Sequence, residues 1–357
     1  MRKINPFCYL ITVCTLLIAL FFYYHSQYHK DDQSQRLNLY ICGNYLPDDI
    51  IQQFTRETGI KVRVTEYDNN ETMFTKLKTL KNSGYDIVSP SSYYVEKMRR
   101  NSLLHPLDHN KLPNFKHLHP LLLNLPYDPQ NNYSIPIMWG TTGIIVNRKY
   151  IDPKTVTAWR DLWQSRFRNQ LMMLDDMRDV FSVALMSLGY SINTENSDEI
   201  EAAYQKLREL LPNIKVFNID TIPNIYIDND VTIGIAWSGD AYLAKSENPD
   251  LVYIYPEEGY PLWIENVVIL QDAPHVENAH RFIDFLLRPE IAMQLMQLLG
   301  YSTANHTALT MLPPEFLANH VDRPLEQIYP KATFLRDLDD QICRIYDQDW
   351  EYLKMGD

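Results

Sequence analysis

The sequence predicts an α/β protein built as two lobes that share strands. Apolar stretches of strand length alternate with stretches of helical periodicity, which is typical of largely parallel sheets. The chain has 357 residues, of which 45% are hydrophobic, enough for one large or two medium domains with real cores. No internal repeat and no long Ser/Gly linker separates independent domains.

The first part of the chain predicts three strands, at 37–42, 61–67 and 85–91. Between the first two, "PDDIIQQFTRETG" (47–59) predicts a helix, because a proline and two acids begin it and a glycine ends it. A second helix begins at about residue 70. Its apolar residues recur at helical spacing and are expected to face a core: Met73, Phe74, Leu77 and Leu80.

A second set of units begins near residue 140. Its predicted strands are 143–147 and 231–237. Its predicted helices are 177–188, ended by a glycine, 196–212, ended by a proline, and a long one at 279–300.

The first 36 residues stand apart from this pattern. Arg2 and Lys3 precede an uncharged, mostly apolar run from Phe7 to Tyr24, which indicates an export signal or a membrane anchor. Bulky aromatic residues stand where a signal-peptide cleavage site needs small ones, and Cys14 lacks the small preceding residue of a lipoprotein cysteine. We therefore expect an uncleaved anchor, with its basic end in the cytoplasm and the body outside the membrane.

The charge and the cysteines limit the function. The formal net charge is −12, so the surface repels nucleic acid and attracts cations. Only Cys42 and Cys343 lie beyond the anchor, which allows one disulfide or two free thiols, and we expect free thiols.

Common catalytic motifs are absent from the sequence: it has no G-x-x-x-x-G-K-[ST], G-x-S-x-G, H-E-x-x-H or C-x-x-C. The histidines cluster among Pro, Asn and Lys, which favours a solvated loop over a metal site. These histidines are His105, His109, His117 and His119. We expect no cofactor and no metal.

"LMMLDDMRDVF" (171–181) places three aspartates directly after an apolar, strand-like run. Asp176, three residues before Asp179, is typical of a helix cap. A ligand-binding role is compatible with capping, because open α/β sheets bind ligands at the carboxyl ends of their strands.

Two further segments, "WSGDAY" (237–242) and "PLWIENV" (261–267), each place an acid two or three residues from a tryptophan. A carboxylate beside an aromatic face suits an alkylammonium group, because the anion pairs with the charge and the ring adds about 0.5–2 kcal/mol of cation–π attraction. The alternative is surface charge beside core tryptophan.

The order of several blocks resembles the bacterial periplasmic spermidine/putrescine-binding proteins that serve polyamine ABC transporters. These blocks include "QFTRETGIKV", "YDIVSPSSYYVEKM", "SIPIMWGTTGIIVN", "FLLRPEIA", "GYSTAN" and "IYDQDWEYLK". The resemblance runs from about Leu37 to the end of the chain. It implies the two-lobed periplasmic binding protein fold of type II, with crossing hinge strands and a ligand cleft between the lobes.

That fold implies a division of the chain into one anchor and two interleaved lobes. Residues 37–139 and 266–308 would form lobe 1, and residues 140–265 and 309–357 would form lobe 2. The segment 1–36 would remain the signal or anchor.

Carried over position by position, the family's polyamine site maps onto ten residues, which we call the candidate residues: Tyr45, Ser91, Tyr93, Asp176, Asp179, Trp237, Asp240, Trp263, Glu265 and Tyr301. The sequence departs from the family at Cys42, where a tryptophan usually walls the cleft. It departs again near Arg336, where the family has a glutamine that bonds the amine.

The resulting hypothesis is a monomeric, extracytoplasmic binding protein that delivers a linear polyamine to an ABC transporter permease and ATPase. Asp176 and Asp179 would hold one amine, and Glu265 with Asp240 another. The alternatives are a membrane-tethered receptor without transport, a glycoside hydrolase that uses Asp176 and Glu265 as acid and base, and a ferric-iron site of tyrosine oxygens. The sequence does not rank the polyamines.

Overall fold

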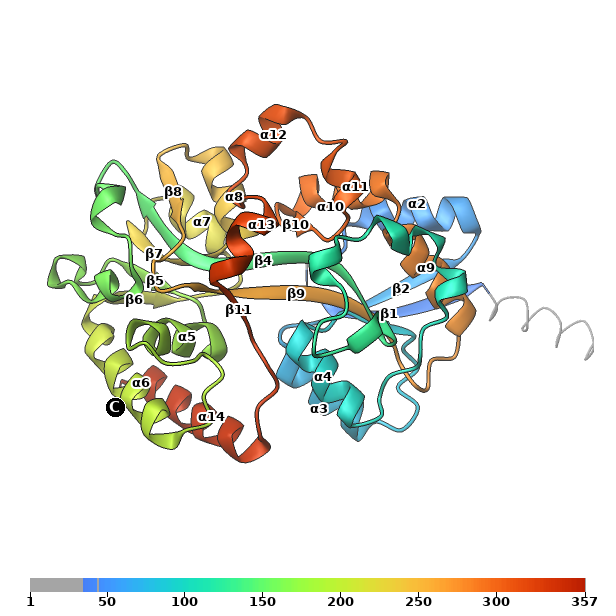
Figure 1. Ribbon diagram of the computed structural model, residues 1–357, viewed down its shortest axis with the longest axis horizontal. Coiled ribbons are helices and arrows are strands. Elements are labelled where there is room, and N and C mark those ends of the chain that lie inside the picture. The colour runs from blue at the N-terminus through green and yellow to red at the C-terminus, as the bar shows by residue number, and fades with distance from the viewer. Residues whose placement is uncertain (1–34, 44, 357) are drawn as a thin grey trace, which may run out of the picture.

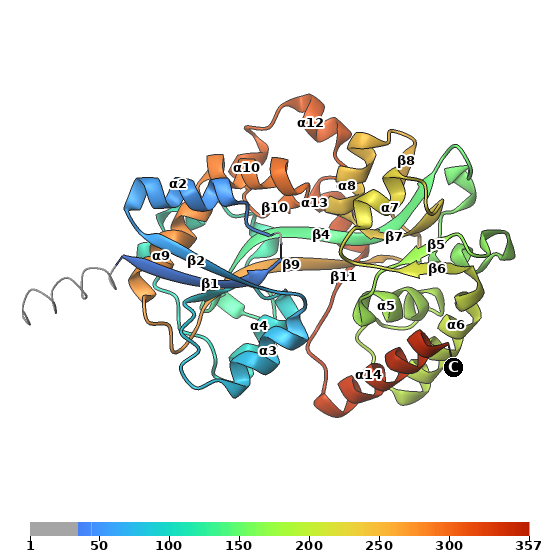
Figure 2. The ribbon, with the colours of Figure 1, turned by 180° about the vertical axis from the view of Figure 1, so that it is seen from behind.

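The structure is a computed structural model that describes residues 35–43 and 45–356, and Figures 1 and 2 show it from front and back. Two lobes lie side by side, and the long strands β4 and β9 run through both of them. The strands are β1 (Arg36–Cys42), β2 (Lys61–Tyr67), β3 (Ile87–Val88), β4 (Ser134–Asn147), β5 (Leu171–Met173), β6 (Ile214–Phe217), β7 (Ile233–Trp237), β8 (Leu251–Ile254), β9 (Tyr260–Ile269), β10 (Ser302–Thr303) and β11 (Ala332–Phe334).

The strands form one continuous sheet with the order β2-β1-β3-β9-β4-β7-β5-β6. At one end, β1 pairs in parallel with β2 and β3. At the other end, β5 pairs in parallel with β6 and β7. The antiparallel pair of β4 and β9 joins these two parallel regions, so the predicted α/β class and the predicted crossing strands are confirmed.

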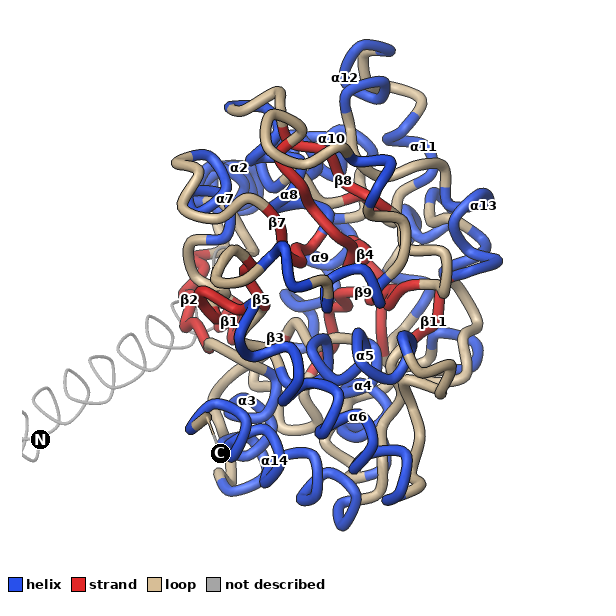
Figure 3. Tube along the Cα trace, turned by 90° about the vertical axis from the view of Figure 1, so that its left-hand side faces the viewer, coloured by secondary structure: helices blue, strands red, loops and turns tan. Residues whose placement is uncertain are grey.

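Helices cover both faces of this sheet, as the side view in Figure 3 shows. Below the sheet in Figure 1, α3 (Asn70–Thr79) and α4 (Ser92–Arg100) belong to the first lobe. The other lobe carries α5 (Met177–Ser187), α6 (Ser197–Leu210) and α14 (Asp340–Met355) on that face. The remaining helices are α2 (Asp48–Thr58), α7 (Ile222–Ile227), α8 (Ser238–Glu247), α9 (Val276–Leu286), α10 (Pro289–Leu299), α11 (His306–Leu309), α12 (Pro314–Asn319) and α13 (Leu325–Ile328).

The helix boundaries follow the punctuation of the sequence. Gly59, at φ 74°, ends α2, and its N–H bonds to the carbonyl of Thr55. The side chain of Asn69 caps α3 by accepting from the N–H of Thr72. The apolar face of α3 lies in the core as predicted, except that Leu80 follows the last turn and is 45% exposed.

Three predicted elements need correction. The helix expected at 279–300 is two helices, α9 and α10, because Pro289 forces Arg288 into an extended conformation. The strand expected at 143–147 is the second half of the longer β4. Of the strand expected at 85–91, only Ile87 and Val88 form a strand, which pairs with β1 and β9. Pro90 has no N–H to continue the ladder, and Ser91 forms an isolated bridge to Glu265 before α4 begins.

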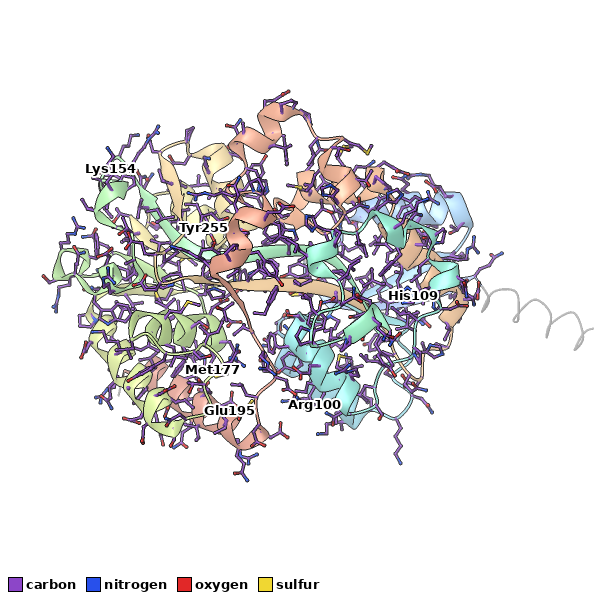
Figure 4. All side chains as sticks on the ribbon, in the orientation of Figure 1. Arg100, His109, Lys154, Met177, Glu195 and Tyr255 are labelled. Carbon is purple, nitrogen blue, oxygen red and sulfur yellow. The ribbon has the colours of Figure 1, made fainter. Side chains whose placement is uncertain are left out.

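The segment between α4 and β4 consists of loops and short 3₁₀ turns, as the histidine-rich composition predicted. His109, labelled in Figure 4, lies in the outer part of its lobe and donates its Nε2–H to the carbonyl of Asn131. Within the described residues, no group of three or more His, Cys, Asp or Glu side chains is arranged to hold a metal ion.

None of the helices in the described part of the chain has the length and apolar character that a membrane span requires. The predicted anchor, from Phe7 to Tyr24, lies outside the described residues.

Candidate functional site

The candidate residues gather where β4, β9 and β7 run beside one another. Met138 of β4 lies opposite Glu265, and Gly140 lies opposite Trp263. Further along β4, Thr142 lies opposite Trp237. Alternate residues of a strand share a face, and so do cross-strand partners. The side chains of Trp237, Trp263 and Glu265 therefore rise from one face of the sheet, at the junction of the lobes.

Two glycines make room for the aromatic side chains of this face. A Cβ at Gly140 would lie 2.4 Å from the ring of Trp263, and one at Gly239 would lie 2.2 Å from the ring of Tyr301. Both rings therefore pack directly on backbone, which a larger residue at either glycine would prevent.

Asp176 lies between β5 and α5 as the N-cap of the helix, and Asp179 lies in the first turn of α5. The side chain of Asp176 accepts from the N–H of Asp179 at 2.9 Å, so the predicted cap is confirmed. Asp179 in turn accepts from the hydroxyl of Thr142 at 2.6 Å and from the indole N–H of Trp237 at 2.7 Å. The same pair of acids thus starts a helix and faces the strands of the junction.

Burial shifts the protonation of these acids. It raises the pKa of Asp179 to about 7, and the negative charge of Asp176 adds to the effect. The hydrogen bonds from Thr142 and Trp237 lower the pKa by less than burial raises it. Burial also raises the pKa of Asp176. A cation that pairs with both acids would reverse these shifts.

At the opposite end of this face, a hydrogen bond joins Ser91 to Glu265 of β9. The hydroxyl of Ser91, at the start of α4, donates to Glu265 Oε1 at 2.5 Å. Ser91 is held in place by Asn70, whose side-chain amide donates to the Ser91 hydroxyl at 3.1 Å. Glu265 is 6% exposed, and burial raises its pKa to about 7.

Asp240, Tyr301, Trp263 and Tyr45 form an aromatic group with one acid. The hydroxyl of Tyr301 donates to Asp240 Oδ2 at 2.6 Å. The Tyr301 ring lies edge-on to Trp263 at 5.1 Å and to Tyr45 at 6.2 Å, measured between ring centroids. Burial raises the pKa of Asp240 to about 6. We call Asp179, Asp240 and Glu265 the cleft carboxylates.

Tyr93 lies in a different environment from the other candidate residues. The guanidinium of Arg178 stands 5.7 Å from the centre of its ring. Arg178 is buried and donates to the carbonyls of Ile192 and Arg336, both at 3.4 Å. The arginine near the predicted amine site is therefore Arg178, whereas Arg336 itself is exposed.

Two cavities lie at this end of the site, beside Tyr93 and Asp176. A cavity of about 350 Å³ lies between α3, α4, α5 and α14, and Tyr93 and Arg178 line it. A second cavity of about 330 Å³ is lined by Asp176. In Figure 4, Met177, which lines both, lies on the side of its lobe that faces the other lobe. Glu71 of α3 and Asp347 of α14 also line both cavities, so acids from both lobes face this opening.

Tyr45, Glu265 and Tyr301 form what we call the inner end of the site, and little space remains around them. The cavity beside Tyr45 and Glu265 measures about 30 Å³, roughly the space of one water molecule. The cavity beside Tyr301 measures about 10 Å³. The structure thus brings the inner candidate residues together in a closed arrangement.

Cys42 lies close enough to Glu265 for the charge of the carboxylate to raise the pKa of the thiol. Burial, and after it the Glu265 carboxylate, raise the pKa of the Cys42 thiol to about 12, so the thiol stays protonated. Cys42 and Cys343 are both free, as predicted.

Sequence reasoning missed two residues that contact the site. Arg178 stands between Asp176 and Asp179 in the quoted "DDMRD", where its position in the first turn of a buried helix was the available signal. Thr142 is the second threonine of "WGTTG". It stands two residues after Gly140, the partner of Trp263, and lies on the same face of the sheet.

Known proteins share this architecture and sequence. The family model described as bacterial extracellular solute-binding protein matches residues 49–323. The spermidine/putrescine-binding periplasmic protein of Salmonella typhimurium is 42% identical over 331 residues, which cover 93% of this chain and 94% of the relative. The spermidine/putrescine-binding periplasmic protein 1 of Haemophilus influenzae is 39% identical over 317 residues, which cover 88% of this chain and 88% of the relative.

A solved structure is similar over the same extent. The spermidine/putrescine ABC transporter substrate-binding protein of Streptococcus pneumoniae is 36% identical and superposes with a TM-score of 0.76, covering 90% of this chain and 99% of that one. These matches confirm the resemblance seen in the sequence. From its fold, its sequence and the matched segment together, the chain belongs to the family of bacterial extracellular solute-binding proteins.

Proposed function

We propose that this protein captures a linear polyamine outside the cytoplasm and delivers it to an ABC transporter. One observation carries the proposal: the buried Asp179 and Glu265 and the half-buried Asp240 lie beside aromatic rings, and the side chains that donate hydrogen bonds to them are all neutral. No Lys, Arg or His of the described residues forms an ion pair with any of the three. Buried charge without a partner is costly, so a ligand with several ammonium groups would stabilise this arrangement.

The candidate residues take the following roles in the proposal. Asp176 and Asp179 hold one ammonium group, and Glu265 with Asp240 holds another. The rings that cover the alkyl chain are Tyr93, Trp237, Trp263 and Tyr301. Tyr45 and Ser91 supply neutral hydrogen bonds. No step requires a bond to be made or broken, and we propose binding without catalysis.

The spacing along β4 favours a triamine over a diamine. Glu265 lies opposite Met138, and Asp179 is bonded to Thr142, four residues further on. Four strand residues span about 13 Å. Fully extended, putrescine separates its two nitrogens by about 6 Å and spermidine separates its outer nitrogens by about 11 Å, so the triamine covers more of this distance. The small volume around Glu265 means that the lobes must separate to admit the chain.

The transporter partners and the location follow from the relatives' names. We propose that residues 1–36 hold the protein at the inner membrane, with the body in the periplasm as a monomer. We propose the same lobe boundaries as the sequence indicated, with the hinge in β4, in β9 and in the return of the chain near residue 309.

Calorimetric titration of the protein with putrescine, cadaverine, spermidine and spermine, after a denaturing wash to remove bound amine, tests the function. We expect one-to-one binding with a dissociation constant of about 10 µM or lower, equivalent to about −7 kcal/mol, and tighter binding of spermidine than of putrescine. Lysine and arginine serve as controls. No heat and no thermal stabilisation with any polyamine would exclude the proposal.

A further inference from the structure

Asp322 lies in the segment between α12 and α13, outside any helix or strand. Its carboxylate accepts hydrogen bonds from hydroxyl groups in four other parts of the chain. Its Oδ2 accepts from Ser238 at 3.0 Å and from Ser302 at 2.8 Å. Its Oδ1 accepts from Tyr255 at 3.0 Å and from Thr141 at 3.4 Å. An ionised carboxylate has about four acceptor positions, so these hydroxyls use its capacity fully.

Three of these hydroxyl residues are sequence neighbours of residues at the candidate site. Ser238 follows Trp237, and Ser302 follows Tyr301. Thr141 precedes Thr142, which donates to Asp179. The fourth, Tyr255, directly follows β8, and its hydroxyl completes the set.

The start of α8 and the start of β10 must keep a fixed distance for the site to form. Tyr301 packs on the backbone of Gly239, where a Cβ would lie 2.2 Å from its ring. From there its hydroxyl reaches Asp240 in the first turn of α8, at 2.6 Å. Because Asp322 Oδ2 accepts from both Ser238 and Ser302, a single atom links the two segments that carry this pair.

We propose that Asp322 is a positioning residue for ligand binding. It holds Tyr301 against Asp240 and Trp237 against Asp179, and it does so through Ser238, Ser302 and Thr141 rather than by touching the ligand. The affinity test of this inference rests on the proposed function. The hydrogen bonds of Asp322 that define the inference are present without a ligand.

Asp322→Asn tests the inference with little change of volume. The amide keeps one oxygen and presents an NH₂ group, so two of the four hydroxyls lose their acceptor. Asp86→Asn is the matched control. Asp86 is a buried aspartate of the first lobe that accepts from the backbone N–H groups of Asn38 and His275, both at 2.7 Å, away from the candidate residues.

With spermidine as the probe and the full chain at a temperature where both variants are folded, Asp322→Asn is expected to weaken binding tenfold or more. Asp86→Asn is expected to lower the melting temperature at least as much and to keep the dissociation constant within twofold. Wild-type affinity in the Asp322→Asn variant would overturn the inference, and so would an equal loss of affinity in both variants. If Asp322→Asn does not fold, Ser302→Ala removes one of the same hydrogen bonds and should weaken binding at least threefold.

A measurement without ligand separates this inference from the proposed function. Tyr301→Phe deletes the hydroxyl that donates to Asp240, and its effect on the free energy of unfolding is measured in the wild-type and Asp322→Asn backgrounds. We expect a smaller loss in the variant background, because the Tyr301–Asp240 bond is already weakened there. Strictly additive losses would refute the positioning role even if the protein binds no polyamine at all.

Discussion

Asp86 and Asp179 are both buried aspartates, but their surroundings differ. Asp86, in the core of the first lobe, accepts from two backbone N–H groups and lies 3.0 Å from the ring nitrogen Nδ1 of His275. Asp179 accepts only from a hydroxyl and an indole N–H, next to a second acid. The lobe core satisfies its carboxylate with fixed donors and an imidazole. The cleft leaves its carboxylates with capacity for an incoming cation.

The difference teaches that burial of an acid does not by itself mark a ligand site. What marks it is burial combined with few and neutral donors. Glu265 has one side-chain donor, Ser91, and Asp240 has one, Tyr301, among the described residues. In each cleft carboxylate burial is the largest influence and raises the pKa, which is the signature of a charge that the protein alone does not compensate.

The largest expected effect comes from neutralising a cleft carboxylate. Glu265→Gln and Asp179→Asn should each weaken polyamine binding by tenfold to a thousandfold, because losing one partner of a buried pair costs up to about 3–5 kcal/mol. The same substitutions should raise the melting temperature of the ligand-free protein, since an uncompensated buried charge is removed. Calorimetry and thermal melts measure both quantities. Unchanged affinity in both variants would refute the assignment of these acids.

The opposite pattern is expected for Asp86→Asn. Replacing an acceptor oxygen with an NH₂ group faces donor against donor and should cost about 1–3 kcal/mol of unfolding free energy. Chemical denaturation measures this loss. An increase in stability would show that the core acid and the cleft acids do not differ in the way described.

The pH dependence of the cleft should follow from its raised pKa values. Asp179 and Glu265 titrate near 7 and Asp240 near 6 in the folded protein, above their unfolded values. The folded state therefore binds more protons than the unfolded state between about pH 4 and pH 7, and this contribution to stability is present at low pH and lost as pH rises through 7. Affinity for a polyamine should change in the opposite direction, falling up to about tenfold for each pH unit below 7 for Asp179 and for Glu265, and below 6 for Asp240.

Thermal melts and titrations from pH 5 to pH 8 measure both trends. Glu265→Gln is the control, and it should reduce the pH slope of the stability. The same slope in the variant and in the wild type would contradict the role given to Glu265.

The smallest expected effect concerns the outer rim of the cleft. Lys97 and Arg100 of α4 form ion pairs with the segment 337–340, which leads into α14: Lys97 Nζ lies 3.2 Å from Asp340, the first residue of α14, and Arg100 Nη1 lies 3.1 Å from Asp337. This segment is tied to the other lobe, because Glu195 accepts from the N–H of Asp339, and Figure 4 shows Glu195 and Arg100 on opposite sides of the gap between the lobes. The rim pairs therefore join the lobes in the closed arrangement.

Replacing both Lys97 and Arg100 by alanine should weaken polyamine binding by about twofold to fivefold, since an exposed ion pair contributes about 0.2–1 kcal/mol. The loss should disappear at high salt. Arg148→Ala is the control, because Arg148 pairs with Asp250 within one lobe. Titrations at low and high salt measure the effect, and a loss as large as that of Glu265→Gln would place the main binding charge at the rim.

Local sequence predicted a large part of the fold and the start of the site. The α2 stop at Gly59, the Asp176 cap of α5 and the α/β alternation depend on neighbouring residues, so periodicity and punctuation were sufficient. The same reasoning failed at 279–300, where the apolar periodicity outweighed Pro289. The order of the family blocks indicated which acids and aromatic residues would meet.

The donors of the cleft carboxylates were decided only by the tertiary structure. Ser91 and Glu265 are separated by 174 positions in the chain, and Thr142 and Asp179 by 37. The same holds for Arg178, whose guanidinium lies beside the ring of Tyr93. Hydrogen bonds and burial depend on side chains that distant segments bring together, whereas periodicity and caps are properties of a few consecutive residues. The sequence by itself therefore determined which acids this protein carries at its strand ends, and the packing of the two lobes decided which of them have only neutral side chains as donors.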